Sequence, residues 1–339
     1  AGEDPPHERC FDKISFRKGF DERDQYLLLG GQSHGYHSHP DGNSIIAYTD
    51  EGLLWIFDNG YFVPDTVEQN TIAVYRDGLF EPVPRLTSLD AHADFPTVGM
   101  TQTSVAAYNG MDWRRNLIWA KEQYFVVIDE LTAREAGDYG CQCIFRVIGK
   151  PEIEAERVLL HQGTARFVLR TDGHPTWSLQ QVTPPAAGRS GIFENQSAEL
   201  KAGESLSFQN LFYCPTGEED LPYEIVRAAP NAALVSGSEG YACVGSGQLD
   251  VPGLPQIEAA LFHVTPQRFS LADARRLAWP DRFVFSCAGD TPVDIYLDLA
   301  QGRGRVVADE EVVLNLHADY ARDLKVDGRE RVAAAEEAG

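Results

Sequence analysis

Short runs in which hydrophobic and polar residues alternate, each closed by a turn signal, make up most of this chain. Typical runs are SIIAYTDEGLLWIF from residue 44, ARFVLRT from residue 165 and VDIYLDL from residue 293. A period of two residues places successive side chains on opposite faces of a strand. Asp and Gly tolerate positive φ, which predicts hairpin turns at Asp50-Glu51-Gly52, Asp77-Gly78, Thr171-Asp172-Gly173 and Asp327-Gly328.

Only two stretches have helical character. They are SLADARRL, residues 270–277, with Ser270 as a candidate N-cap, and the polar end RVAAAEEAG, residues 331–339. So many strands with so few helices favour stacked antiparallel sheets. We therefore predict an all-β fold, a large multilayer antiparallel β-sandwich followed by a smaller β unit. Gly and Pro cluster in SGQLDVPGLPQ, which predicts a sandwich domain of residues 1–250 and a smaller domain of residues 251–339.

Composition and charge narrow the function classes. Hydrophobic residues make up 43% of the 339 positions and charged residues 24%, which is ordinary for a folded protein with a substantial core. The net charge of −22, without clustered Lys and Arg, argues against nucleic acid as a partner. No apolar run approaches the roughly 18 residues of a spanning helix. The six cysteines contain no CxxC pair, and buried free thiols are the expected state of most of them.

A cluster of histidines stands out in the stretch GGQSHGYHSHPDGNS. If this stretch is extended, His37 and His39 lie on the same face. A metal site would need at least one further ligand, and Asp58 and His92 are the candidates. Two His and one Asp with an open position suit zinc. The alternative is that these histidines only form hydrogen bonds in a polar loop, which is the commoner fate of histidine.

Two adjacent arginines open the stretch WRRNLIWAKEQYFVVIDEL. In a strand Arg114 and Arg115 must face opposite sides, so one can point into a groove while the other is solvated or paired with an acidic residue. Such a local cluster can bind a carboxylate in a globally negative protein. The alternative is an ordinary exposed strand with surface salt bridges. The chain contains neither a G-x-S-x-G elbow nor a P-loop or dinucleotide-binding loop, which removes several large enzyme classes.

Four motifs follow one another within roughly residues 11–148. They are HSHPD, LLWIFDNG, QNTIAVYRDG and WRRNLIWAKEQYFVVIDEL. This order resembles the C-terminal β region of the heparinase II/III-like polysaccharide lyases, whose pattern is a His-x-His-x-Asp loop, a strand ending in Asp-x-Gly, an Asn-Thr-[Val/Ile] strand, and an Arg-led strand ending in Val-[Val/Ile]-Asp. Residues 150–250 fit loosely, and the remainder does not align.

The resemblance implies a reaction and a set of site residues. Family members cleave uronic-acid-containing polysaccharides by β-elimination, in which donors arranged around the uronate carboxylate stabilise the charge that develops. His39, Asp58 and His92 would be the ligands of a structural Zn2+. The candidate catalytic residues would be His37, Arg114 and Arg115, and the candidate substrate-binding residues Asn70 and Tyr36.

The resemblance also bears on the partners. Family members carry an N-terminal (α/α) toroid that supplies most acid and base groups, and this chain begins almost directly at the sandwich. We therefore expect a portion of a longer lyase, a chain completed by a separate toroid chain, or a noncatalytic carbohydrate-binding or structural module. The expected partner is an acidic polysaccharide met in a secreted or periplasmic setting, and a homo-oligomer is left open.

Overall fold

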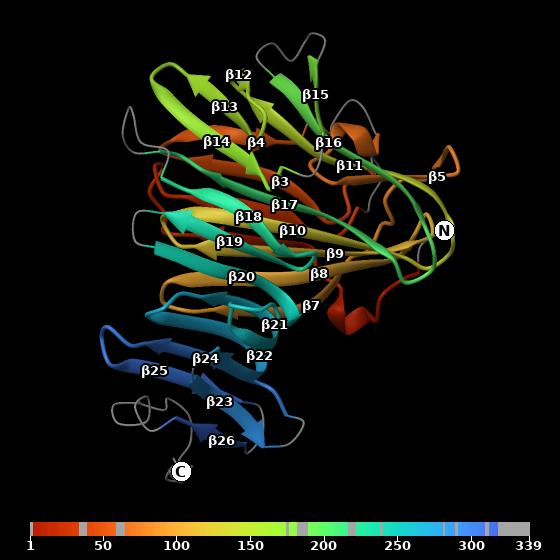
Figure 1. Cartoon of the computed structure of the whole chain (residues 1–339). Helices are drawn as coiled ribbons and strands as arrows, with labels where there is room; N and C mark the ends of the chain where they lie inside the picture. Colours follow the sequence, from red (N-terminus) through yellow and green to blue (C-terminus); the bar gives the residue numbers. More distant parts are fainter. Residues whose placement is uncertain are drawn as a thin grey trace.

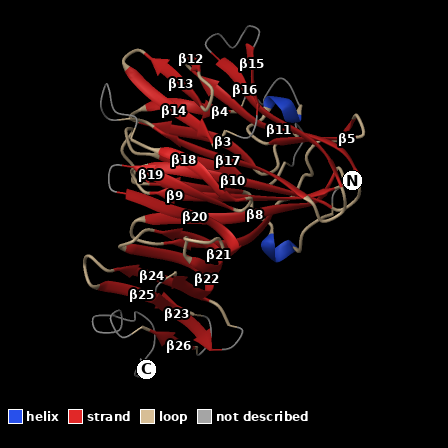
Figure 2. Ribbon diagram, in the orientation of Figure 1, coloured by secondary structure: helices blue, strands red, loops and turns tan. Residues whose placement is uncertain are grey.

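Three antiparallel sheets make up the chain. The computed structural model describes residues 3–33, 39–58, 65–173, 176–181, 189–215, 222–237, 240–280, 282–288, 291–308 and 312–317. Within these residues the two helices are single 3-10 turns, η1 (His7–Arg9) and η2 (Thr66–Glu68), and strands form nearly everything else (Figures 1 and 2).

Sheet 1 contains β1 (Lys13–Arg17), β2 (Tyr26–Gly30), β3 (Ser44–Asp50), β4 (Leu53–Phe57), β11 (Gly137–Ile148), β16 (Arg189–Leu200) and β15 (Thr176–Gln181) in spatial order. In addition, β5 (Ile72–Arg76) pairs with β11, and β6 (Leu79–Phe80) pairs with β5. Sheet 2 follows the order β12 (Lys150–Ile153), β13 (Arg157–Gln162), β14 (Ala165–Thr171), β17 (Ser205–Tyr213), β10 (Tyr124–Ala133), β9 (Met111–Ala120), β8 (Val98–Tyr108) and β7 (Ser88–Asp94).

Sheet 3 follows the order β18 (Glu224–Ala229), β19 (Ala232–Gly237), β20 (Gly240–Leu249), β21 (Gln256–Val264), β22 (Arg268–Trp279), β23 (Arg282–Ala288) and β26 (Val313–Leu316), with β24 (Val293–Asp298) paired to β22 and β25 (Arg303–Val307) paired to β24.

Sheet 2 is the middle layer. One face packs on sheet 1 through a large apolar cluster that includes Trp55, Trp113 and Phe125. The other face packs on sheet 3 through a second cluster that includes Ile118 and Leu261. Figure 1 shows the first strands of sheet 3 in front of sheet 2, with the later strands continuing below them. The predicted all-β multilayer sandwich is confirmed.

Two predicted hairpin turns are confirmed, whereas the one predicted at Thr171-Asp172-Gly173 is wrong, because β14 ends at Thr171 in sheet 2 and the next strand, β15, lies in sheet 1. Glu51 and Gly52 connect β3 to β4 with φ of 54° and 76°, and Asp77 and Gly78 connect β5 to β6 with φ of 51° and 77°. Positive φ suits Gly and is tolerated by few other residues. The predicted turn at Asp327-Gly328 and the predicted helix at 331–339 lie outside the described residues.

The helix predicted over residues 270–277 is wrong, because these residues lie inside β22. Leu271 and Leu277 join the core cluster of sheet 3, whereas Ala272 joins the cluster between sheets 2 and 3. Register shifts next to Asp273, whose φ is 47°, interrupt the alternation of the strand. The bulge hides the period of two residues, and pairing with β21, β23 and β24 overrides the local helical propensity.

The boundary predicted between residues 250 and 251 falls in the turn that connects β20 to β21. These two strands pair along their length, from Cys243 opposite Val264 to Leu249 opposite Ile257. The chain instead passes from sheet 2 to sheet 3 between β17 and β18. Gly and Pro in this stretch therefore mark a hairpin within one sheet.

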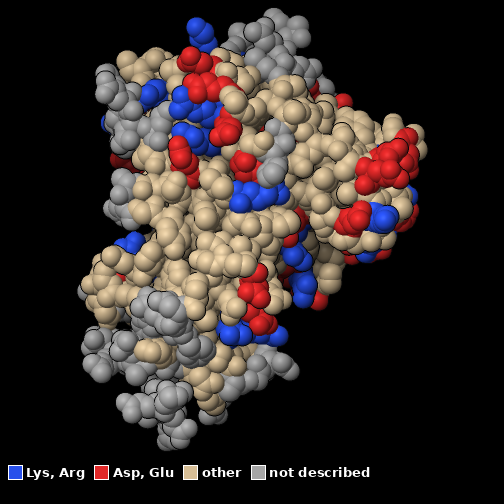
Figure 3. All heavy atoms as spheres, in the orientation of Figure 1, with Lys and Arg blue, Asp and Glu red and all other residues tan. Residues whose placement is uncertain are grey.

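The cysteines are free, as the sequence predicts, and the charged surface residues are mixed in sign. All six cysteines, each in a described segment, are free thiols, and Cys141, Cys143 and Cys243 are buried. On the face shown in Figure 3, Lys and Arg side chains lie in small groups mixed with Asp and Glu. None of the helices in the described residues has the length and apolar character needed to cross a bilayer.

Candidate functional site

The predicted motifs converge where sheet 1 divides at β11. Along one edge, β11 pairs with β5 from Tyr139 to Cys143, whereas Val147 pairs with β4. Between these pairings, the N–H of Ile144 donates to the Thr71 carbonyl, and the N–H of Arg146 donates to Asn70 Oδ1. We call this place the fork. At the fork, the carbonyl of Thr71 and the side-chain oxygen of Asn70 thus accept the hydrogen bonds that a neighbouring strand would otherwise accept from β11.

Asp58 lies at the fork, held by hydrogen bonds from two residues. Its Oδ1 accepts hydrogen bonds from Asn70 N at 2.8 Å and Asn70 Nδ2 at 2.6 Å. Ser44 Oγ lies 3.1 Å from Oδ1 and 3.0 Å from Oδ2. Burial raises the pKa of Asp58 to about 7, while these donors favour the ionised form. Ser44 at the start of β3, Asp58 directly after β4 and Asn70 directly before Thr71 therefore form one cluster.

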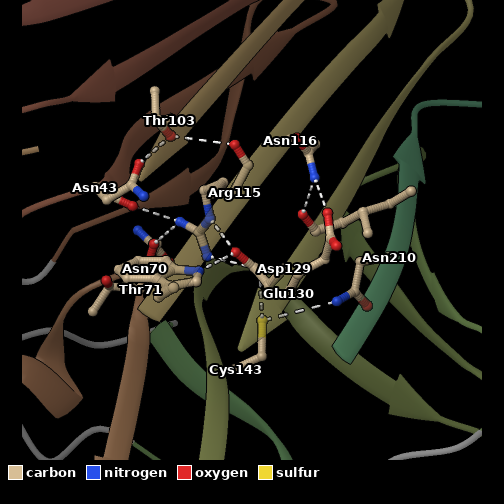
Figure 4. Close-up of polar contacts among 12 residues, drawn as sticks. Asn43, Asn70, Thr71, Thr103, Arg115, Asn116, Asp129, Glu130, Cys143 and Asn210 are labelled. Carbon is tan, nitrogen blue, oxygen red and sulfur yellow. Dashed lines mark hydrogen bonds and ion pairs between the residues drawn. The ribbon is translucent and has the colours of Figure 1, made fainter. Parts of the chain in front are cut away.

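Arg115 secures the same cluster from within the core (Figure 4). Its Nε and Nη2 donate to Asp129 Oδ1 and Oδ2 at 2.8 and 3.0 Å, and its Nη1 donates to the carbonyls of Asn43 and Asn70 at 2.7 and 3.1 Å. Side chains of Arg115 and Asp129 are 1% and 0% exposed. A bidentate guanidinium–carboxylate contact fixes both groups in one orientation. Arg115 therefore ties sheet 2 to both motif segments of sheet 1.

A polar seam continues from this ion pair between sheets 1 and 2. Cys143 Sγ lies 3.9 Å from Asp129 Oδ2 and 3.8 Å from Asn210 Nδ2 (Figure 4). Asn210 Nδ2 also donates to Glu194 Oε2 at 3.1 Å. Burial raises the pKa of Glu194 well above its ordinary range. A neutral carboxyl at this depth avoids an unpaired charge beside Asp129.

The predicted catalytic and substrate-binding residues fall in three environments. His37 and Tyr36 lie outside the described residues. Arg114 is exposed on β9. Arg115 and Asn70 are 1% exposed, with side chains engaged inside the protein. The expectation that adjacent arginines face opposite sides, one of them paired with an acidic residue, is confirmed by Arg115. Substrate contact by Arg115 or Asn70 does not agree with their burial, so both residues hold the fork in place.

The predicted zinc ligands do not gather into one site. Asp58 lies in the fork, whereas His92 is exposed on β7, the edge strand of sheet 2. Among the described residues, which include His39, Asp58 and His92, no three His, Cys, Asp or Glu side chains form a group that could hold a metal ion. The carboxylate of Asp58 is instead engaged by Ser44 and Asn70. This set of three ligands does not fit zinc, and no step of the chemistry below depends on a metal.

Several residues of the fork escaped sequence reasoning. Ser44 Oγ, the Asp129 carboxylate and the backbone N–H of Arg146 complete the hydrogen bonds of the fork, and of these residues only Asp129 belongs to one of the four motifs, where the sequence assigns it no role. Asp129 and Arg146 each carry a charge within an apolar run, FVVIDEL and CIFRVI. A charged residue in a buried strand is rarely left unpaired, and this signal could have identified both.

Comparison with known proteins gives a structural likeness only. No family model matches the chain, and no curated protein matches it in sequence. Heparan sulfate lyase HepC from Pedobacter heparinus superposes with a TM-score of 0.57 at 15% identity, covering 72% of this chain and 42% of that one. A structure of heparinase III superposes with a TM-score of 0.55 at 12% identity, covering 68% and 41%.

These neighbours bear out the predicted resemblance at the level of the fold. The chain spans about two fifths of the length of these solved structures. At this identity the likeness establishes a shared fold, and function must be argued from the site.

Proposed function

We propose that this chain is the β-sandwich part of a polysaccharide lyase that cleaves uronic-acid-containing polysaccharide by β-elimination. The observation that carries the proposal is the fork, where hydrogen bonds of Arg115 and Asn70 hold Asn43, Asn70 and Asp58, residues of the HSHPD, QNTIAVYRDG and LLWIFDNG motif regions, in one place. The fold of two lyases named for heparan sulfate and heparin, and the four ordered sequence motifs, support the same conclusion.

The reaction sets clear demands on the protein. A base removes the C5 proton of the uronate, the C4–O bond breaks, and an acid protonates the departing oxygen, which leaves an unsaturated sugar. Negative charge builds up around the carboxylate in the transition state, so fixed donors and cations there contribute most. Groups held by a rigid scaffold act better than mobile ones, because their orientation costs no reorganisation.

The site residues take different roles in this proposal. His37 faces the sugar and exchanges a proton with it, and Tyr36 contacts the substrate beside it. Arg114 is the exposed cation of the motif strand and attracts the acidic glycan toward a protein of net charge −22. Arg115 holds the carbonyls of Asn43 and Asn70 from inside the protein, and Asn70 holds Asp58. The remaining acid and base groups come from an (α/α) toroid domain or chain.

The alternative is a noncatalytic carbohydrate-binding or structural module. Such a module would present aromatic rings to the sugar, and the tryptophans are the first candidates. Trp55 and Trp113 are 0% exposed and Trp119 is 3% exposed, so these three belong to the core. Trp177 is half-buried. The burial of these rings favours the lyase over the module.

The test is an assay for unsaturated uronate products. The chain, alone and together with the (α/α) toroid domain of a heparinase III, is incubated with heparan sulfate and with a panel of other acidic polysaccharides, and absorbance of the products is followed. We expect activity with at least one glycan, lost in His37→Ala and retained in the matched control His161→Ala, since His161 lies on β13 with its side chain 36% exposed beside Glu152. Glycan binding without product in every combination would favour the module.

A further inference from the structure

Arg146 occupies an unusual position on the outer face of sheet 1. It lies in β11 directly opposite Gly191 of β16, and its side chain is 2% exposed. The guanidinium stacks on the ring of Phe193 with 5.2 Å between Cζ and the ring centroid. A single-turn segment containing η2 covers it. Arg146 is thus a buried cation, and it lies outside the apolar clusters through which the three sheets pack together.

The bonds of Arg146 all lead to that covering segment. Nε donates to the Val67 carbonyl at 3.1 Å, and Nη2 donates to the same oxygen. Nη2 also lies 3.3 Å from Glu68 Oε1. The backbone N–H of Arg146 donates to Asn70 Oδ1. One residue of β11 therefore holds the segment 67–70 at several points, and Asn70 in turn contacts Asp58.

Gly191 makes room for this arrangement. A Cβ at residue 191 would lie 2.7 Å from Arg146 Nη1 and 2.8 Å from a ring carbon of Phe193, closer than real Cβ atoms approach. The requirement is space, so any larger residue at 191 displaces the guanidinium without removing its charge. The glycine at position 191 thus leaves the space that the guanidinium of Arg146 occupies.

Stability alone does not explain this arginine. Burial lowers the pKa of Arg146, and its Nη1 has no hydrogen-bond partner among the described residues. A buried cation with an unused donor costs free energy, and apolar replacements of buried ion pairs are often neutral or stabilising. In return for this cost, the buried arginine holds segment 67–70 in one orientation.

We propose that Arg146, seated over Gly191, is a positioning residue that fixes segment 67–70 and, through Asn70, the carboxylate of Asp58 at the fork. The consequence for glycan cleavage rests on the proposed function above. The positioning itself can be measured without any activity.

The experiment compares hydrogen exchange and unfolding in the full chain. Arg146→Met removes the guanidinium, Gly191→Ala displaces it, and Arg146→Lys keeps a cation that can reach the Val67 carbonyl. Gly140→Ala is the matched glycine control in β11, because its Cβ would meet only ordinary contacts at 3.8 Å. Arg275→Met, in sheet 3, is the matched arginine control.

We expect amides of residues 67–71 to lose about tenfold protection in Arg146→Met and Gly191→Ala, since each loses anchoring bonds of the segment. Amides of β10 and both controls should keep their protection, the denaturation midpoint should move less than in Arg115→Met because Glu68 is 18% exposed, and Arg146→Lys should recover part of the protection. Unchanged exchange at 67–71 overturns the inference. Loss of protection throughout the protein also overturns it, because Arg146 would then be a general structural residue.

A second readout links the inference to function. Cleavage of heparan sulfate, or of the glycan identified above, should fall in kcat more than it rises in KM in Arg146→Met and Gly191→Ala. If the wild-type chain cleaves no glycan, the proposed function fails, and the exchange data still decide the role of Arg146.

Discussion

Arg115 and Asp129 illustrate how single residues set the geometry of the fork. Both are withdrawn from water, which costs several kcal/mol per ion, and their bidentate contact with further hydrogen bonds offsets that cost. Asp129 also accepts a hydrogen bond from Trp113 Nε1 at 2.7 Å. Because every donor and acceptor orients the others, the Arg115–Asp129 pair fixes the position of sheet 1 relative to sheet 2 at this point.

Breaking this pair should be costly. Arg115→Met leaves Asp129 as a buried, uncompensated charge, so we expect the free energy of unfolding to fall by about 3–5 kcal/mol. Urea denaturation followed by circular dichroism measures the change. The double variant Arg115→Met/Asp129→Leu should recover part of the loss, and an unchanged single variant would contradict the burial of the pair.

His92 offers the opposite expectation. Its side chain is exposed on an edge strand and lies apart from Asp58, so His92→Ala should change neither the zinc content of the purified chain nor its Tm by more than about 1 °C. Elemental analysis and thermal unfolding provide the two measurements. Zinc lost specifically in His92→Ala would restore the three-ligand site that the sequence predicts.

The sequence predicts part of the site and misses the rest for a physical reason. The facing rule for adjacent strand residues separates Arg114 from Arg115, and the structure confirms it. The rule cannot say which arginine is buried, because that depends on which face of β9 meets sheet 1. Asp129 is the register partner of Arg115 across the β9–β10 hairpin. Partners such as Ser44 and Arg146 come from other strands, and long-range register is not written in local sequence.

At the scale of elements, β22 shows how tertiary pairing decides secondary structure. It pairs with three strands and supplies side chains to two apolar clusters. The local pattern around Asp273 resembles a helix because a bulge shifts the alternation. Strands without bulges, such as β10, are recognisable from sequence alone. Bulged strands become recognisable only when their neighbours are known.

Sheets 2 and 3 also meet through a polar contact. Tyr124 Oη and His263 Nε2 lie 2.9 Å apart in the interface, and His263 is 8% exposed. Burial lowers the pKa of His263 from 6.5 to about 4. The folded protein therefore holds this histidine neutral at pH values where the unfolded chain protonates it.

This difference predicts an acid sensitivity of the interface. Between pH 6.5 and about 4 the unfolded state binds one more proton at His263, so stability falls as pH falls, by roughly 1.4 kcal/mol per pH unit. The measurement is the free energy of unfolding from pH 7 to pH 4 for the wild type minus that for His263→Gln, which takes up no proton. Parallel curves for the two proteins would refute it.

At the scale of the whole molecule, sheet 3 is a layer of the sandwich, and residue 250 lies inside it, between the paired strands β20 and β21. The cluster between sheets 2 and 3 combines Ile118 and Val126 of sheet 2 with Leu261, Ala272 and Tyr296 of sheet 3. The alternation of strands correctly predicts stacked sheets. The order of the strands within each sheet decides where a domain boundary can lie. This order depends on pairing between segments far apart in the chain, which the local sequence does not predict.

A fragment of residues 1–250 should therefore fail as an independent domain. It would uncover apolar residues of β7 and β8 such as Ala91 and Met100, because β21 and β22, which contact these strands, are removed, and it would leave β20 without its partner β21. Exposed apolar faces of this kind drive association. We expect aggregation or rapid proteolysis of the fragment under conditions where the full chain is monodisperse, judged by size-exclusion chromatography and limited trypsin digestion. A soluble fragment that unfolds cooperatively would show that sheet 3 is dispensable.

The middle position of sheet 2 has a consequence for how the chain reaches its fold. Its strand β10 pairs with β17, joining Phe125 to Phe212, and both of its faces are covered only when sheets 1 and 3 are in place. Contacts so distant in sequence form slowly. During synthesis β7 to β10 emerge before β17 and all of sheet 3, with apolar residues on both faces waiting for partners. Slow refolding and dependence on chaperones are therefore expected of the same layer that makes the finished fork rigid.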